Sequence, residues 1–541
     1  MIITNLKHRL QSFSHRRQSS ILSASLVLAI TFGLSALLGL FRSKFLYSRF
    51  FNCCVSDLDV YNAAFRLPDL IFKLLVTGAL SASFIPVFSS YLHKNKAEAY
   101  KMASTVINLL LLVFVVASLT VLVFTHQLSS IIAAGFSPSQ IDLMTSLTRI
   151  LLIAQIFFLI SNFITGILQV HQIFTIPALS PIVYNIFIIL SIFTLAPIFG
   201  IYGVVYGTVV GAFFHLAIQI PLVKRLGFKY HPILDIKQKG VKEIIRLMIP
   251  RSLSLGLGEI ENTVTLFFAS TLAAGSLSLL NLAMQLMYLP SRIFGTTIGQ
   301  ASLPILSKNI ARNELETFRS TVQRTILQSL FIAIPITTLI LIHRVTIVRL
   351  AFGAKQFPWS ATLLTAKLLA FLAPAIICQA IIQILIRSFY ALHNTKTPLW
   401  VSAASLITNI LTSYYFINYT NLGVTGLAVS ASIGNLVQCF GLFYLFIKQV
   451  DGFLWGATLK RFGIILPCSL VMGIMSWSSL KFFDLFILDT TRTASLILVF
   501  ILSSAIGLIS YVASSSYLKV EEFNDYRRYF SKFIHFLLRR N

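Results

Sequence analysis

Charged residues are scarce in this chain. Asp, Glu, Lys and Arg together make up only 11% of its 541 residues, whereas hydrophobic residues make up 56% and the mean hydropathy is +0.84. A water-soluble protein of this length could not bury so much apolar surface, so a soluble globular class is excluded. The composition predicts an integral membrane protein.

Cysteine and catalytic motifs are also nearly lacking. The five cysteines are an odd number without a CxxC spacing, which gives no support to a disulfide framework or a zinc site. The sequence contains neither a phosphate-binding GxxxxGK loop nor an HExxH motif. His171, His215 and His393 are isolated, and we expect hydrogen-bonded structural roles for them. We therefore predict a protein that is not an enzyme and has no cofactor or metal site.

Fourteen long apolar stretches follow one another along the chain. An α-helix needs roughly 20 residues to cross about 30 Å of hydrocarbon, and several stretches exceed this length. The alternating pattern of a membrane β-barrel does not occur. We predict an all-α polytopic membrane protein with about 14 transmembrane helices. The expected spans are 20–41, 60–92, 104–126, 140–170, 176–197, 201–223, 244–272, 277–307, 318–342, 360–391, 398–418, 423–448, 459–481 and 492–517.

Lys and Arg outnumber Asp and Glu by 43 to 17, and they are unevenly distributed. They gather near the N-terminus and after even-numbered spans, with the richest clusters at 224–246 and 518–541. Because Lys and Arg are enriched in cytoplasmic loops, we expect both termini to be cytoplasmic. The clusters also favour contact with anionic lipid headgroups, and we predict no nucleic-acid partner. Neither residue occurs in the alternate connections at 127–138, 197–200, 273–276 and 419–422.

Two glycine-rich segments indicate an internal repeat. FGIYGVVYGTVVG (199–211) and LGVTGLAVSASIG (422–434) place three glycines at the same spacing, and Gly203, Gly207 and Gly211 are expected to allow close helix packing. Each copy has six spans, so we predict two parallel six-helix lobes plus two C-terminal helices, typical of an alternating-access carrier. The expected order is a cytoplasmic N-terminus (1–19), an N-lobe (20–223), a basic cytoplasmic linker (224–243), a C-lobe (244–448), a helix pair (459–517) and a basic cytoplasmic tail (518–541).

Charged residues inside the spans are the candidate functional residues, because each costs at least about 2.5–3.5 kcal/mol at the bilayer centre. Arg66, Asp69 and Lys73 are spaced so that they share one face of a helix. Arg and Lys match phosphate oxygens in charge and geometry, so this face suits an anionic substrate such as a pyrophosphate. The alternative is a set of internal salt bridges that only holds helices together.

Six segments carry a family resemblance: LLGLFRSKF (37–45), FRLPDLIFKLLVTGALSASFIPVFSSY (65–91), IFTIPALSPIVYN (173–185), LFFASTLAAGS (266–276), QASLPILSK (300–308) and FYALHNTKTP (389–398). They resemble the MurJ/MviN family of lipid II flippases, within the multidrug/oligosaccharidyl-lipid/polysaccharide exporter superfamily. The resemblance covers about residues 20 to 450. It implies transport of undecaprenyl-pyrophosphate-linked lipid II from the inner to the outer leaflet of the bacterial cytoplasmic membrane, for peptidoglycan synthesis and cell shape, by a protein that we expect to be a monomer. It also implies a groove for the lipid tail beside the last two helices.

The resemblance also suggests a substrate site. Gln285 stands where family members usually have an arginine, and Arg292, two helical turns later on the same face, is predicted to supply that charge. The alternative is that Arg292 pairs with Glu259 or Glu261. The implied substrate-binding residues are Arg42, Asp59, Arg66, Asp69, Lys73, Gln285 and Arg292.

Coupling to an ion is a further expectation from the resemblance, since some relatives use acidic residues on spans 7 and 11 for sodium. The matching span 7 position here is Thr265, with Glu261 one turn earlier and Asn409 available on span 11. Together with Glu259, these residues are candidates for coupling, and sodium, protons and the membrane potential are all open as driving forces.

Other functions are compatible with the same composition. The chain could be a flippase for another lipid-linked oligosaccharide, a drug exporter of the same superfamily, or a membrane scaffold without transport activity. An exporter of organic cations would need an acidic cavity, whereas these residues predict a cationic one. Retention of Arg42, Arg66, Lys73 and Arg292 argues against a scaffold.

The charge asymmetry generates a topological prediction. A single cysteine introduced at Gln238, in the basic linker, is expected to be protected from a membrane-impermeant thiol reagent added to intact cells, because this connection is predicted to be cytoplasmic. The same cysteine should react after the cells are permeabilised. Labelling of this cysteine in intact cells would show that the predicted orientation is wrong.

Overall fold

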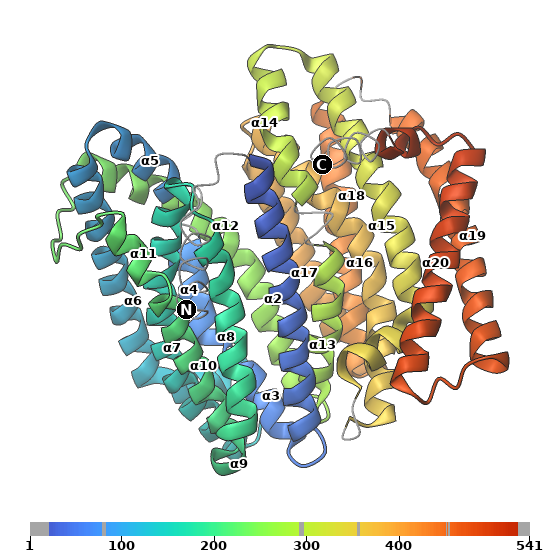
Figure 1. The fold of residues 1–541 in the computed structure, drawn as a ribbon, viewed down its shortest axis with the longest axis horizontal. Helices are drawn as coiled ribbons and strands as arrows, with labels where there is room; N and C mark the ends of the chain where they lie inside the picture. Colours follow the sequence, from blue (N-terminus) through green and yellow to red (C-terminus); the bar gives the residue numbers. More distant parts are fainter. Residues whose placement is uncertain are drawn as a thin grey trace, which may run out of the picture. The chain divides into compact units, whose positions relative to one another are not determined.

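The computed structural model describes residues 21–77, 83–291, 297–353, 357–450, 452 and 455–527. These residues form helices and no strand (Figure 1). Nine of the helices are long and apolar enough to cross a membrane, and each of the fourteen predicted spans coincides with helix over most of its described residues. This confirms the predicted all-α membrane fold.

The chain divides into two compact units, Met1–Leu277 with Ala354–Phe357 and Ser278–Gly353 with Pro358–Asn541. The first unit contains the predicted span 7, whose helix α12 packs against α4, η1 and α6. The compact units therefore divide the chain at a different place from the predicted basic linker at 224–243, and the boundaries of the repeat stay a prediction.

Two helices of the first unit begin at side chains that cap their free N–H groups. The side chain of Asn95 accepts hydrogen bonds from the backbone N–H groups of Ala97 and Glu98 and so begins α6. Ser137 and Gln140 form a reciprocal capping box that begins α7. The elements are α2 (Ile21–Phe50), α3 (Val55–Ala64), α4 (Arg66–Phe72), the π-helical η1 (Lys73–Thr77), α5 (Ile85–Lys94), α6 (Lys96–Ile132), α7 (Pro138–Val170), α8 (Thr175–Thr194), α9 (Ala196–Phe199), α10 (Ile201–Ala217), α11 (Ile220–Arg225) and α12 (Lys239–Ser270).

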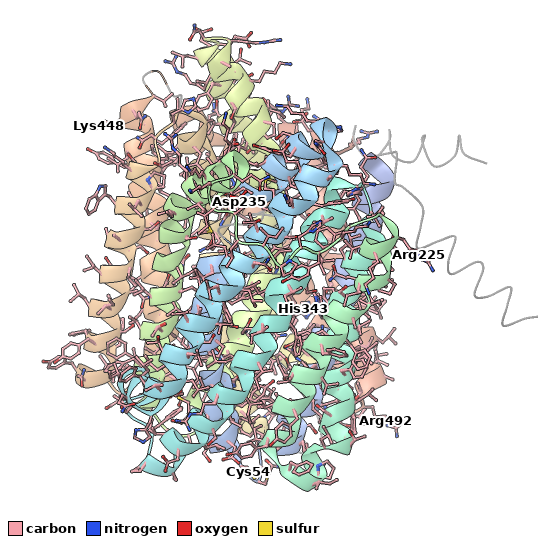
Figure 2. The ribbon with its side chains drawn as sticks, turned by 90° about the vertical axis from the view of Figure 1, so that its left-hand side faces the viewer. Cys54, Arg225, Asp235, His343, Lys448 and Arg492 are labelled. Carbon is pink, nitrogen blue, oxygen red and sulfur yellow. The ribbon has the colours of Figure 1, made fainter. Side chains whose placement is uncertain are left out.

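The second unit is built in the same way from long helices, among which α15 contacts both α16 and α19. Nε2 of buried His343 on α15 forms a hydrogen bond of 2.9 Å with the hydroxyl of Ser476 on α19. The exposed side chain of Lys448 lies in the last turn of α18 (Figure 2). The elements are α13 (Ser276–Pro290), α14 (Thr297–Ala311), α15 (Leu315–Phe352), α16 (Trp359–Ala391), α17 (Lys396–Tyr419), α18 (Val424–Gln449), α19 (Trp455–Phe486) and α20 (Thr493–Tyr517).

Buried phenylalanines form the core of each unit. In the first unit, Phe84 stacks on Phe88 with ring centroids 5.3 Å apart and meets the ring of Phe163 edge-on at 5.1 Å. In the second unit, Phe389 and Phe446 meet edge-on at 5.7 Å. Because lipid tails are as apolar as these side chains, helix association here depends on close packing more than on removal of apolar surface from water.

A proline lies close to the point where the predicted span at 60–92 is divided into α3 and α4. Pro68 has no backbone N–H, so the carbonyl of Ala64, four residues earlier, receives no helical hydrogen bond from it. The hydroxyl of Thr148 on α7 donates to this carbonyl instead, at 3.1 Å. A carbonyl in hydrocarbon must find a partner within the protein, and this bond supplies one where α3 ends and α4 begins.

The glycines of the predicted repeat have matching conformations. Gly200, the N-cap residue of α10, has φ +57° and ψ −137°. Gly423, the N-cap residue of α18, has φ +53° and ψ −133°. Residues with a Cβ atom rarely adopt this left-handed region, so both positions require glycine. The agreement supports the internal repeat.

The following glycines of α10 allow close packing against α8 and α9. A Cβ atom placed on Gly203 would lie 2.5 Å from the backbone of Leu195, and one on Gly211 would lie 3.0 Å from Tyr184. One on Gly207 would meet the hydroxyl of Ser191. This confirms the packing role predicted for the three glycines.

The close approach at α10 generates a stability prediction. Gly203→Ala should lower the free energy of unfolding by about 1–3 kcal/mol, because the added methyl group meets backbone that cannot rotate away. Gly39→Ala on α2 is the matched control, since a Cβ there meets nothing within 4 Å. Thermal unfolding in detergent micelles measures both. Equal melting temperatures for the two variants would contradict the packing argument.

Candidate functional site

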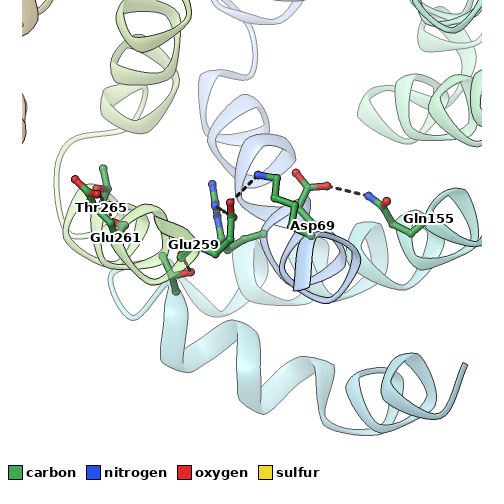
Figure 3. Close-up of polar contacts among 8 residues, drawn as sticks. Asp69, Gln155, Glu259, Glu261 and Thr265 are labelled. Carbon is green, nitrogen blue, oxygen red and sulfur yellow. Dashed lines mark hydrogen bonds and ion pairs between the residues drawn. The ribbon is translucent and has the colours of Figure 1, made fainter. Parts of the chain in front are cut away.

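The charged residues of α4 and η1 meet a carboxylate from α12. Arg66 Nη1 lies 3.2 Å from Glu259 Oε2, and Lys73 Nζ lies 3.0 Å from Glu259 Oε1 (Figure 3). One carboxylate therefore bridges two cations, using a different oxygen for each. All three residues belong to the first compact unit.

Asp69 lies between the two cations in the sequence and interacts electrostatically with both. Its Oδ1 accepts a hydrogen bond of 2.8 Å from Nε2 of Gln155, a buried residue of α7 (Figure 3). The structure therefore brings Arg66, Asp69 and Lys73 together on one side of α4 and η1, as their spacing predicts. With Glu259, the cluster holds two cations and two carboxyl groups.

The backbone of η1 helps to place Lys73. The N–H of Lys73 is shared between the carbonyls of Asp69 and Leu70, and a π-helical turn follows through Thr77. Such π segments are rare and are often found at functional sites. The wider turn starts at the residue whose ammonium group reaches Glu259.

Exposure differs among the three bridged side chains. Glu259 is 10% exposed, Arg66 is 21% exposed and Lys73 is 39% exposed. The Nε of Arg66 is buried without a hydrogen-bond partner among the described residues. The guanidinium thus retains a donor direction that Glu259 does not use, and Lys73 is the most accessible member of the cluster.

Arg42 and Asp59 belong to the same unit, on α2 and α3. Arg42 on α2 is half-buried and interacts electrostatically with the hydroxyl groups of Tyr61 and Tyr184. Asp59 on α3 is buried, and its Oδ2 accepts a hydrogen bond of 2.6 Å from the N–H of Gly275. Asp59 therefore holds the turn that follows α12.

The remaining predicted site residues are spread over both units. Gln285 is half-buried on α13, and Arg292 lies outside the described residues. Thr265 Oγ1 donates to the backbone carbonyl of Glu261 at 3.0 Å, and both side chains leave α12 on a different side from that of Glu259 (Figure 3). Asn409 is buried on α17 and accepts from Ser413 at 3.2 Å.

No group of three or more His, Cys, Asp or Glu residues suited to a metal occurs in the part of the chain that the structure describes. The assignment of Glu261, Thr265 and Asn409 to ion coupling stays a prediction.

The sequence did not predict the contact of Gln155 with Asp69 or the pairing of Glu259 with Arg66 and Lys73. Gln155 is a lone amide within an apolar span, and such a residue usually needs a buried hydrogen-bond partner. Its position in the span could therefore have indicated a buried polar contact. Two of the isolated histidines have the predicted structural role. His215 Nδ1 pairs with Ser161 at 2.7 Å, and His171 Nε2 pairs with Tyr100 at 3.3 Å.

Comparison with known proteins identifies the family. The family model described as lipid II flippase MurJ matches residues 54–496. The chain is 26% identical over 533 residues to the probable lipid II flippase MurJ of Bdellovibrio bacteriovorus, covering 97% of this chain and 99% of that protein. It is 27% identical over 460 residues to that of Rickettsia prowazekii, covering 84% of this chain and 89% of that protein.

Solved structures show the same fold. A lipid II flippase MurJ in an inward closed conformation superimposes with a TM-score of 0.73 at 24% identity, covering 91% of this chain and 98% of that one. An inward-facing multidrug resistance MATE family transporter of the MOP superfamily gives a TM-score of 0.61 at 16% identity, covering 82% of this chain and 98% of that one. The family model spans most of this chain, and the chain belongs to the lipid II flippase MurJ family.

Proposed function

We propose that this protein moves lipid II from the inner to the outer leaflet of the cytoplasmic membrane by alternating access, supplying peptidoglycan synthesis. Family membership supports the substrate, and the observation that carries the chemistry is the pair of cations on α4 and η1. The other proposed functions, export of drugs or of another lipid-linked oligosaccharide, have no comparable observation in their favour.

The cations suit the diphosphate that joins the lipid to its headgroup. A diphosphate presents several anionic oxygens, which a guanidinium binds in a planar fork and an ammonium binds as a point charge. Arg66 and Lys73 lie inside a predicted span, where a charge that has no partner is costly, so a charged headgroup that crosses the bilayer needs such partners along its path. Arg42 is assigned to the same substrate site.

The remaining assignments complete the proposal. The carrier acts as a monomer in the cytoplasmic membrane with both termini in the cytoplasm, and it needs no nucleic-acid partner. Its driving force is the membrane potential or a gradient of sodium or protons. Glu261, Thr265 and Asn409 are the residues that we assign to ion coupling.

Complementation tests the proposal. The wild-type gene should restore growth to a bacterial strain depleted of its own lipid II flippase. Lys73→Gln and Arg42→Gln should each reduce flipping of labelled lipid II by about tenfold or more, because each removes a charged hydrogen bond worth about 1.5–3 kcal/mol. Membrane abundance measured by immunoblot should stay near that of the wild type.

Lys101→Gln is the matched control, because Lys101 is an exposed residue of α6 outside the cluster. Failure of the wild type to restore growth, at normal abundance, would reject the proposed function. Normal flipping by Lys73→Gln or Arg42→Gln would remove that residue from the substrate site.

A further inference from the structure

The bridge made by Glu259 resembles the contacts that a phosphate would make. Its two oxygens bind two cations separately, Oε2 facing Arg66 at 3.2 Å and Oε1 facing Lys73 at 3.0 Å. A phosphate group also presents anionic oxygens that can bind a guanidinium and an ammonium at once. Glu259 therefore occupies the cations in the way that the proposed substrate would.

The two carboxyl groups of the cluster differ in what holds them. Asp69 is on the same segment as Arg66 and Lys73, and Gln155 of α7 donates to it. Glu259 comes from α12, so its contribution depends on where this helix lies. Of the two carboxyl groups, Glu259 is the one that would lose its cation partners if α12 moved relative to α4 and η1.

A diphosphate and Glu259 cannot both bind these cations in the present geometry. The substrate would bring at least about two further negative charges to a cluster whose cations already have a carboxylate partner, and like charges at such distances repel. Lys73 is the accessible member through which an incoming anion can begin to displace Glu259.

We propose that Glu259 is an internal counter-anion that competes with the diphosphate of the substrate for Arg66 and Lys73, so that headgroup binding releases α12 from α4 and η1. This rests on the proposed function. It assigns to Glu259 a part in substrate binding and release, in place of the ion-coupling role that the sequence suggests.

The packing of α12 near Glu259 is suited to such a release. Gly256 faces Leu74 of η1, and a Cβ on Gly256 would lie 3.3 Å from its Cδ2, so the helices approach closely with little side-chain volume between them. A Cβ on Gly258 would meet nothing within 4 Å. At these two positions α12 therefore places no side chain against its surroundings, and the ion pair of Glu259 with Lys73 joins α12 to η1 nearby.

Binding measurements test the competition. Glu259→Gln removes the charge while retaining the shape, so purified protein should bind undecaprenyl diphosphate about tenfold or more tightly than wild type, the gain expected from losing a competing charged hydrogen bond. Its maximal rate of lipid II flipping should fall, because no carboxylate displaces the headgroup at release. Glu243→Gln, at an exposed position of the same helix, is the matched control and should change neither quantity.

A purely structural ion pair gives a different pattern. In that case Glu259→Gln would bind undecaprenyl diphosphate no more tightly than wild type, which would overturn the inference and leave the proposed function standing. If the wild type itself bound no undecaprenyl diphosphate, the proposed function would fail and the inference with it.

A second measurement does not require Glu259 to be replaced. Cysteines at Leu74 and Gly256, in a background whose five native cysteines are replaced by alanine and which still restores growth, should be joined by a short bismaleimide in the substrate-free protein. Undecaprenyl diphosphate should reduce the cross-linked fraction several-fold, and uncharged undecaprenol should not. Equal cross-linking with both lipids would contradict release of α12.

Discussion

The need to neutralise charge inside a bilayer governs the arrangement of the first unit. Arg66 and Lys73 lie in a predicted span, where uncompensated charges would be expensive. Their partner Glu259 is more deeply buried than either, with 10% of its side chain exposed, so removing one member of the bridge would leave a buried charge without a counter-ion. The packing of α12 against α4 and η1 keeps these three side chains in contact.

Irregular backbone makes this contact feasible. Pro68 removes one helical hydrogen bond, and Thr148 satisfies the released carbonyl of Ala64, so the helix can break in hydrocarbon without an orphaned acceptor. The π segment then starts at Lys73, the residue whose ammonium group meets α12. The absence of a side chain at Gly256 lets α12 come close.

Much of the fold could be predicted from the sequence, because a membrane span requires a long apolar segment. The glycine pattern predicted a repeat, and the similar backbone angles of Gly200 and Gly423 support it. The shared face of the charges on span 2 followed from helical spacing. The pairing of Arg66 with Glu259 could not be predicted in this way, because the packing of helices that are distant in the sequence brings these residues together, and local periodicity does not encode it. Gln155 was missed for the same reason.

The structural and the functional interpretation of the buried charges are two aspects of one requirement. A carrier that works by alternating access must return without its substrate, and during that step cations selected to bind a diphosphate have no diphosphate to bind. A permanent salt bridge would neutralise the cations during the return step but would prevent substrate binding. Unpaired cations would allow substrate binding but would destabilise the substrate-free state. A carboxylate on a neighbouring helix satisfies both conditions, because it neutralises the cations when the site is empty and leaves with its helix when the headgroup arrives. Glu259 meets both conditions because it lies on α12, apart from the segment that carries Arg66, Asp69 and Lys73.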